Sequence, residues 1–92
     1  MARSVYSRDY QVFLEQLRQA REESGLTQRE VADRLGRSQS FVAKCEQGHN
    51  RVDVAQLVEF CRALGVPLVR FMEKYSAALE STLESPRESG SD

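Results

Sequence analysis

Two helix-start signals and two helix-stop signals lie close together between residues 27 and 48, and they limit strongly how this chain can fold. Thr27 and Glu30 have the spacing of a capping box, in which a hydroxyl and a carboxylate satisfy free backbone N–H groups at a helix start. Gly36 ends that helix after about two turns, since glycine adopts left-handed backbone angles without a Cβ penalty. Ser38 starts another helix two residues later, and Gly48 ends it. The spacing predicts a hairpin of two short helices joined by a tight turn.

Apolar residues at helical spacing predict three more helices around this hairpin, and no segment alternates with the period of a strand. The stripe before the hairpin consists of Tyr10, Phe13, Leu14, Leu17 and Ala20. The inner face of the hairpin consists of Val31, Ala32, Leu35, Val42 and Cys45. The stripe after it consists of Val54, Leu57, Val58, Cys61 and Leu64. The last stripe consists of Leu68, Phe71, Met72, Tyr75, Leu79 and Leu83. We therefore expect an all-α fold of five helices with extended first and last helices.

Start and stop signals divide the chain into one domain and two ends. Ser24 and Gly25 end the first helix, Asp53 caps the fourth, and Gly65 ends it. Pro67 suits the first turn of the fifth helix, where its missing N–H does no harm. We expect a flexible N-terminus over residues 1–7, one helical domain over 8–83 with its hairpin core at 27–48, and a disordered acidic tail over 84–92.

Composition excludes several classes of protein. The chain has 92 residues, of which 40% are hydrophobic and 29% charged, as in an ordinary globular domain. Neither a membrane-length apolar run nor an apolar stretch near Met1 is present, so we expect a cytoplasmic protein. Cys45 and Cys61 stand apart from any histidine cluster, which favours free thiols over a disulfide or a metal site. No nucleophile–base pair is recognisable, so we expect neither an enzyme nor a cofactor.

Charge is unevenly distributed along the chain. The formal net charge of −1 argues weakly against a nucleic-acid partner. Residues 28–51, however, carry five basic residues against three acidic ones, whereas residues 72–92 carry two basic residues against five acidic ones. A basic patch is the electrostatic mark of nucleic-acid binding. Spacing and charge together leave two interpretations open, a DNA-binding hairpin and a plain helical bundle with solvated faces.

The hairpin sequence resembles a known family. Residues 25–48 read GLTQREVADRLGRSQSFVAKCEQG, a pattern similar to that of the lambda-repressor-like, Cro-type (XRE) helix-turn-helix regulators. The resemblance covers about residues 10–73. It implies a five-helix fold whose third helix, Ser38–Gln47, enters the major groove of a palindromic operator, and a homodimer that regulates transcription in a bacterium or phage. Small members of the family include phage repressors, controllers of restriction–modification genes and antitoxins.

The resemblance assigns base contacts to four positions of the third helix. In this sequence they are Gln39, Ser40, Ala43 and Lys44. A glutamine can pair with N6 and N7 of adenine, an alanine can touch only a thymine methyl, and a lysine can reach guanine O6 and N7 or a phosphate. The alternative for Lys44 is an ordinary solvated lysine.

The same resemblance assigns phosphate contacts to Gln28, Arg37 and Arg51. Gln28 stands at the start of the second helix, where its amide and free backbone N–H groups both face an anion. Arg37 lies in the turn and Arg51 follows the third helix. The alternative for Gln28 is that it only caps its own helix. His49, in a loop position that often carries a cation in the family, is either a phosphate contact or a solvated side chain.

A structural role is implied for Arg21 and Glu46. In the family, an arginine late in the first helix often pairs with the glutamate before the last glycine of the hairpin. Such an ion pair would tie the third helix to the first. Cys45 stands where a larger apolar residue is common in the family, and we interpret both Cys45 and Cys61 as small buried hydrophobes rather than redox sensors.

The resemblance implies a homodimer, because one recognition helix reads only a few base pairs and two copies can read a palindrome. We expect the fourth and fifth helices to form its interface. The extended first and last helices could pack together within one subunit or across the dimer, or only enlarge the core. The alternative function is a protein-interaction module, such as an antitoxin or adaptor, that binds a partner protein through its first and fifth helices.

Overall fold

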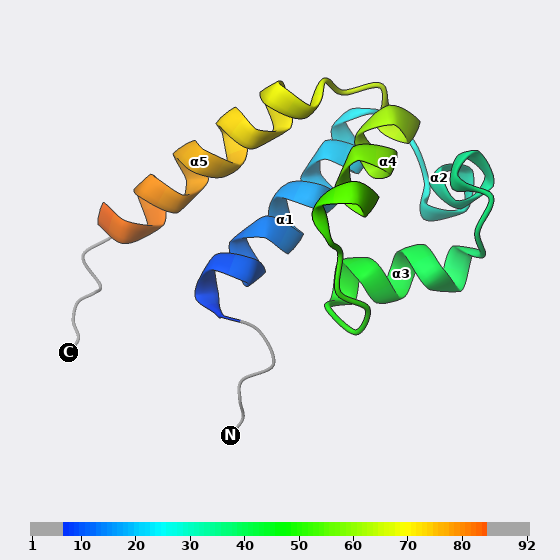
Figure 1. The fold of residues 1–92 in the computed structure, drawn as a ribbon, viewed down its shortest axis with the longest axis horizontal. Helices are drawn as coiled ribbons and strands as arrows, with labels where there is room; N and C mark the ends of the chain where they lie inside the picture. Colours follow the sequence, from blue (N-terminus) through cyan, green and yellow to red (C-terminus); the bar gives the residue numbers. More distant parts are fainter. Residues whose placement is uncertain (1–6, 85–92) are drawn as a thin grey trace.

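A computed structural model describes residues 7–84, and every element in that range is a helix. The five helices are α1 (Arg8–Glu23), α2 (Gln28–Leu35), α3 (Gln39–Gln47), α4 (Val54–Leu64) and α5 (Leu68–Glu84). The all-α prediction is confirmed. Figure 1 shows α2 and α3 joined by a tight turn at one end of the molecule, while α1 and α5 extend toward the other end. None of the helices in residues 7–84 combines the length and apolar content needed to cross a bilayer.

The predicted ends of the domain differ slightly from the structure. Ser7, placed in the flexible N-terminus, caps α1, because its hydroxyl accepts a hydrogen bond from the backbone N–H of Tyr10. Glu84, placed in the acidic tail, is the last residue of α5. Pro67 precedes α5 rather than occupying its first position. The rest of the two predicted ends, residues 1–6 and 85–92, lies outside the described residues.

Side-chain caps explain where the short helices begin and end. The Thr27 hydroxyl accepts from the Glu30 backbone N–H at 3.1 Å, while the Glu30 carboxylate accepts from the Thr27 N–H at 2.8 Å. These bonds to Thr27 hold the pKa of the Glu30 carboxyl below its usual value. Asp53 and Gln56 form a second capping box at the start of α4. Gly36 closes α2 with a φ of 70°, where a residue with a Cβ would be strained.

The core lies where α1, α2, α3 and α4 meet. Its most deeply buried large side chains are Leu17, Val31, Val42 and Cys45. Ala32 of α2 is also buried, and α2 packs closely against α3. Close packing of this kind fixes the angle of the hairpin, because a buried side chain has few alternative arrangements.

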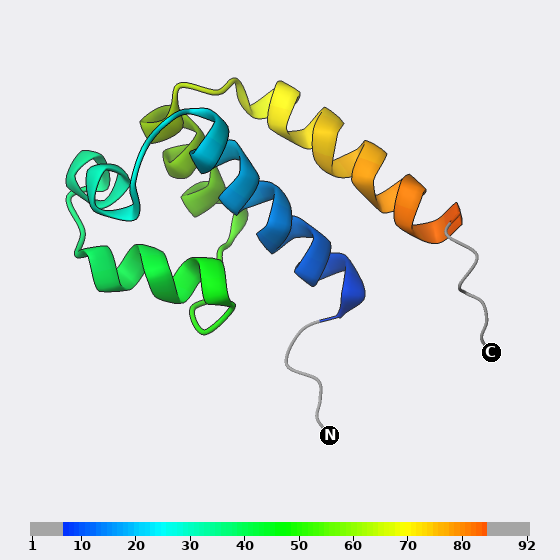
Figure 2. The same ribbon diagram turned by 180° about the vertical axis from the view of Figure 1, so that it is seen from behind.

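Aromatic contacts hold α5 against α1 (Figures 1 and 2). The Phe13 ring lies 5.8 Å from Phe71 and 5.7 Å from Tyr75, centroid to centroid, in edge-to-face geometry. The Tyr75 hydroxyl donates to the Asp9 carbonyl oxygen at 2.9 Å. The extended first and last helices therefore pack together within one chain.

Two residues expected on inner faces are exposed. Val54 is 75% exposed and Met72 is 42% exposed. Val54 has the correct helical phase, but it belongs to the first turn of α4, and an open hollow lined by Val52, Val54, Leu57 and Met72 lies beside it. Met72 follows Phe71, whose ring takes the place against α1. The sequence pattern did not predict the burial of Val12, Val52, Phe60 and Ala63.

Candidate nucleic-acid interface

Helix α3 forms one edge of the molecule. In both ribbon views α3 lies at the lower side of the helical body, and the segment joining α4 to α5 lies at the upper side (Figures 1 and 2). The inner face of α3 buries Val42 and Cys45 in the core. Gln39, Ser40 and Lys44 are exposed on its outer side, and Ala43 is half-buried. The predicted base-contact residues thus share one side of an edge helix.

Hydrogen bonds connect α1 to the last turn of α3. The Arg21 guanidinium donates from Nε to Glu46 Oε2 at 2.6 Å and from Nη2 to Glu46 Oε1 at 3.2 Å. These side chains are only 14% and 6% exposed, respectively. Arg21 Nη1 also donates to the Leu26 carbonyl oxygen at 2.9 Å. The structure therefore brings Arg21 and Glu46 together as a nearly buried, bidentate pair.

Two glutamines extend these hydrogen bonds to Gln39, the exposed first residue of α3. Gln28 Nε2 donates to Glu46 Oε1 at 3.0 Å. Gln39 Nε2 donates to Gln28 Oε1 at 2.8 Å. We call the four residues Arg21, Glu46, Gln28 and Gln39 the amide chain. It joins α1, α2 and α3, and its outer end is the exposed Gln39 side chain.

The two predicted phosphate-binding arginines lie near opposite ends of α3. The Arg37 guanidinium carbon is 3.7 Å from the centroid of the Phe41 ring. The Arg51 guanidinium carbon is 4.4 Å from the centroid of the Tyr10 ring. Both arginines are exposed, so the rings hold the cations by cation–π attraction without covering them. The Tyr10 hydroxyl accepts from the Val52 backbone N–H at 2.9 Å, which anchors the segment that carries Arg51.

The two cysteines and the histidine lie in different surroundings. Cys45 and Cys61 are free and buried. Burial raises the pKa of both thiols; at Cys45 the Arg37 charge opposes this rise and the Glu46 charge adds to it. Protonated, buried thiols behave as small hydrophobes. His49 is exposed in the loop after α3, and residues 7–84 contain no cluster of side chains suited to a metal ion.

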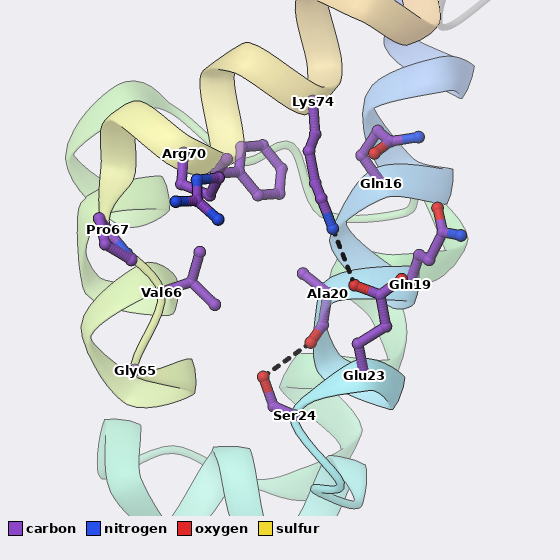
Figure 3. Close-up of a pocket in the computed structure, with 11 residues that line it drawn as sticks. Gln16, Gln19, Ala20, Glu23, Ser24, Gly65, Val66, Pro67, Arg70 and Lys74 are labelled. Carbon is purple, nitrogen blue, oxygen red and sulfur yellow. Dashed lines mark hydrogen bonds and ion pairs between the residues drawn. The ribbon is translucent and has the colours of Figure 1, made fainter.

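A pocket of about 290 Å³ lies between the end of α1, the α4–α5 connection and the start of α5 (Figure 3). Lys74 Nζ donates to Glu23 Oε1 at 3.0 Å across its mouth, so these two charges neutralise each other. Ser24 donates to the Ala20 carbonyl oxygen at 2.8 Å. The pocket is on the side of the molecule away from α3 and contains none of the predicted site residues.

Sequence reasoning missed two features around the site and one on α5. It did not find the direct bond between Gln28 and Gln39, because two residues eleven positions apart meet only once the hairpin is folded. It counted Arg34 only as a positive charge, whereas Arg34 Nη1 donates to the Ala63 carbonyl oxygen at 2.8 Å and ties α2 to α4. It also omitted Val69, which is 68% exposed. Val69 lies three residues before Met72, and this helical spacing was the signal that the two residues share one face of α5.

Comparison with known proteins defines the class. Residues 13–71 match the family described as the helix-turn-helix domain, so the chain is a helix-turn-helix protein. It is 35% identical over 71 residues to y4dL of Sinorhizobium fredii, an uncharacterised HTH-type transcriptional regulator. That match covers 77% of this chain but 36% of y4dL, so the chain spans about a third of that relative. A second regulator of that organism, y4dJ, is 42% identical over 52 residues, covering 56% of this chain and 68% of y4dJ.

Solved structures narrow the class to a family. An XRE-family like protein from Pseudomonas syringae pv. tomato is 43% identical, with a TM-score of 0.70, over 75% of this chain and 84% of that one. The chain therefore belongs to the XRE family, as its sequence pattern predicted. The restriction–modification controller protein C.Esp1396I has a TM-score of 0.76 at 18% identity, over 83% of this chain and 99% of its own, a likeness of fold alone. Both y4dL and y4dJ are named as HTH-type transcriptional regulators.

Proposed function

We propose that this protein is a sequence-specific DNA-binding transcriptional regulator that places α3 in the major groove of an operator. The observation that carries the proposal is the bonded pair of amides, Gln39 and Gln28, at the exposed start of an edge helix. An α-helix fits the major groove, where each base pair presents a distinct pattern of donors and acceptors. This role is performed where the chromosome is, which in a bacterium is the cytoplasm.

The chemistry of Gln39 favours adenine. One Nε2 hydrogen is used by Gln28, so the other hydrogen and the Oε1 acceptor remain for a base. Adenine offers the matching pair, an acceptor at N7 and a donor at N6. Ser40 can bond either kind of group, Lys44 suits guanine or a phosphate, and Ala43 can contact a thymine methyl. These four residues would together read one half of the operator.

Phosphate contacts would hold α3 in register. Gln28 has one Nε2 hydrogen left after its bond to Glu46, and it is the first residue of α2, whose free N–H groups attract anions. Arg37 and Arg51 carry exposed charges beside the two ends of α3. The spacing suits backbone contacts on either side of the bases that α3 would read.

The salt dependence of DNA binding tests the phosphate assignment. Arg51→Gln should weaken binding to all DNA sequences alike and lower the slope of log affinity against log salt by about one for each subunit. Arg70→Gln, the same substitution at an exposed site on α5, is the matched control and should keep the slope of the native protein. Fluorescence anisotropy with labelled duplex DNA over a range of salt measures both. An unchanged slope for Arg51→Gln would remove Arg51 from the interface.

A second copy of the chain is the proposed occupant of an apolar surface on α4 and α5. Val54, Val69 and Met72 are its exposed apolar side chains, and we call these three residues the apolar face. Met72 lines both an open hollow with Val54 and another with Val69, so the face is continuous across the two helices. A two-fold dimer would present two copies of α3 to half-sites about 34–36 Å apart on a palindrome.

The apolar face also favours a second candidate function, an antitoxin or adaptor that binds another protein. The exposed Val69 and Met72 belong to α5, one of the two helices expected for such contacts. Binding through phosphates weakens steeply as salt rises, whereas burial of apolar side chains does not. A chain that binds no duplex DNA at low salt would favour the second function.

A further inference from the structure

Along the amide chain, each glutamine donates its hydrogen bond toward Glu46, and the Glu46 carboxylate sets this order of donors and acceptors. A carboxylate can only accept hydrogen bonds, so the part of the Gln28 amide that faces Glu46 must be its NH2 group. The observed bond from Gln28 Nε2 to Glu46 Oε1, at 3.0 Å, has this orientation. The Gln28 oxygen then points the other way, where it needs a donor.

The orientation of the Gln28 amide in turn sets the orientation of the Gln39 amide on α3. Gln39 supplies the donor through Nε2, 2.8 Å from Gln28 Oε1. Its own Oε1 and one N–H are left outward, and no hydrogen bond to that oxygen is found in the described range 7–84. A glutamine held the other way round would have Oε1 bonded to Gln28 and both N–H groups outward.

We infer that Glu46, which has no place at the DNA surface, is a specificity-determining residue, because it fixes which way the Gln39 amide faces. The inference rests on the proposed function. An outward acceptor and donor match N6 and N7 of adenine, whereas two outward donors match O6 and N7 of guanine. The nearly buried charge on Glu46 thus selects adenine over guanine through two intervening amides.

Replacing the Glu46 carboxylate by an isosteric amide should reverse the orientations of the Gln28 and Gln39 amides. In Glu46→Gln, the new oxygen takes the position that is now 2.6 Å from Arg21 Nε, because an NH2 group opposes a guanidinium donor less at the longer contact of 3.2 Å to Nη2. The NH2 group then faces Gln28. Gln28 turns its oxygen inward and its NH2 toward Gln39, and Gln39 turns its NH2 outward.

The experiment measures one ratio, the affinity for operators with adenine against guanine at the base pair contacted by Gln39. The operator is the sequence that the native protein selects from random DNA, and that pair is the one relaxed by Gln39→Ala. The native ratio should favour adenine by about tenfold, within the usual range for a bidentate contact. Glu46→Gln should abolish this preference or change it to guanine.

Two further variants separate the effect of amide orientation from the effect of a weakened ion pair. Arg21→Lys disturbs the ion pair but leaves Glu46 as an acceptor, so it should keep the adenine preference within about twofold, whatever its effect on overall affinity. Gln28→Glu combined with Glu46→Gln restores an acceptor beside Gln39 and keeps the native net charge. That double variant should recover the adenine preference.

Folding is checked by circular dichroism before each titration. If Glu46→Gln does not fold, Arg21→Met combined with Glu46→Gln replaces it, because that pair leaves no unpaired buried charge. This variant should lose the adenine preference, since nothing then orients residue 46. Retention of the native ratio by a folded Glu46→Gln protein, or an equal loss in Arg21→Lys, would overturn the inference. A native protein that selects no DNA sequence would instead refute the proposed function.

Discussion

Glu46→Ala is expected to lower the free energy of unfolding by about 3 kcal/mol, at the lower end of the range for breaking a buried ion pair. The carboxylate accepts three hydrogen bonds, two from Arg21 and one from Gln28. Its removal leaves the Arg21 charge, 14% exposed, with the Leu26 carbonyl oxygen as its remaining partner. A domain of this size is stable by only about 5–15 kcal/mol, so such a loss is large.

The matched control is Glu73→Ala, which removes a carboxylate from an exposed pair. Glu73 Oε1 lies 3.9 Å from Arg70 Nε, and both side chains are about two-thirds exposed. Exposed pairs of this kind contribute about 0–1 kcal/mol. Urea unfolding followed by circular dichroism compares the two variants under the same conditions. Equal stability losses in Glu46→Ala and Glu73→Ala would show that the buried pair does not hold α3 to α1.

Val69→Glu is expected to separate the proposed dimer and to weaken binding to a palindromic operator by about 100-fold. Val69 is 68% exposed in the isolated chain, and a carboxylate there would have to lose its hydration on burial against a second copy. Two linked half-site contacts exceed the affinity of one by about 10²–10⁴-fold, and a monomer loses that gain. Light scattering should show a mass near 10.5 kDa for the variant at concentrations where the native protein is twice as heavy.

Two controls keep this result specific. Gln19→Glu adds the same charge at an exposed position on α1, beside the pocket of Figure 3 and away from the apolar face, and should leave mass and affinity unchanged. Binding of Val69→Glu to a lone half-site should equal that of the native protein, because α3 is untouched. A native protein that is itself monomeric at micromolar concentration would contradict the dimer.

The helices were predictable because their ends are encoded locally. The capping box of Thr27 and Glu30 and the glycine at residue 36 act within one helical turn, so sequence alone placed α2 correctly. Periodicity found the buried faces where neighbouring helices cover them, as at Val31 and Val42. It was wrong at Val54, because helical phase does not say whether anything covers the first turn of a helix.

The residues of the candidate site could be proposed from the sequence, but their arrangement could not. Sequence similarity singled out Gln28 and Gln39 separately, and Arg21 and Glu46 as an ion pair. That they form one hydrogen-bonded chain depends on the crossing of α2 and α3 and on the approach of α1, which are tertiary distances. The Tyr10 ring under Arg51 could not be predicted either, because the two residues are far apart in sequence.

The most direct measurement of the central claim compares the DNA sequences that the native protein and Gln39→Ala select from a random duplex pool. We expect the native protein to select a palindrome with half-sites about one helical turn apart and an adenine in each half. Gln39→Ala should select the same palindrome with that adenine no longer required, at a cost in affinity of about 1–3 kcal/mol. Identical selected sequences for the two proteins would contradict the account.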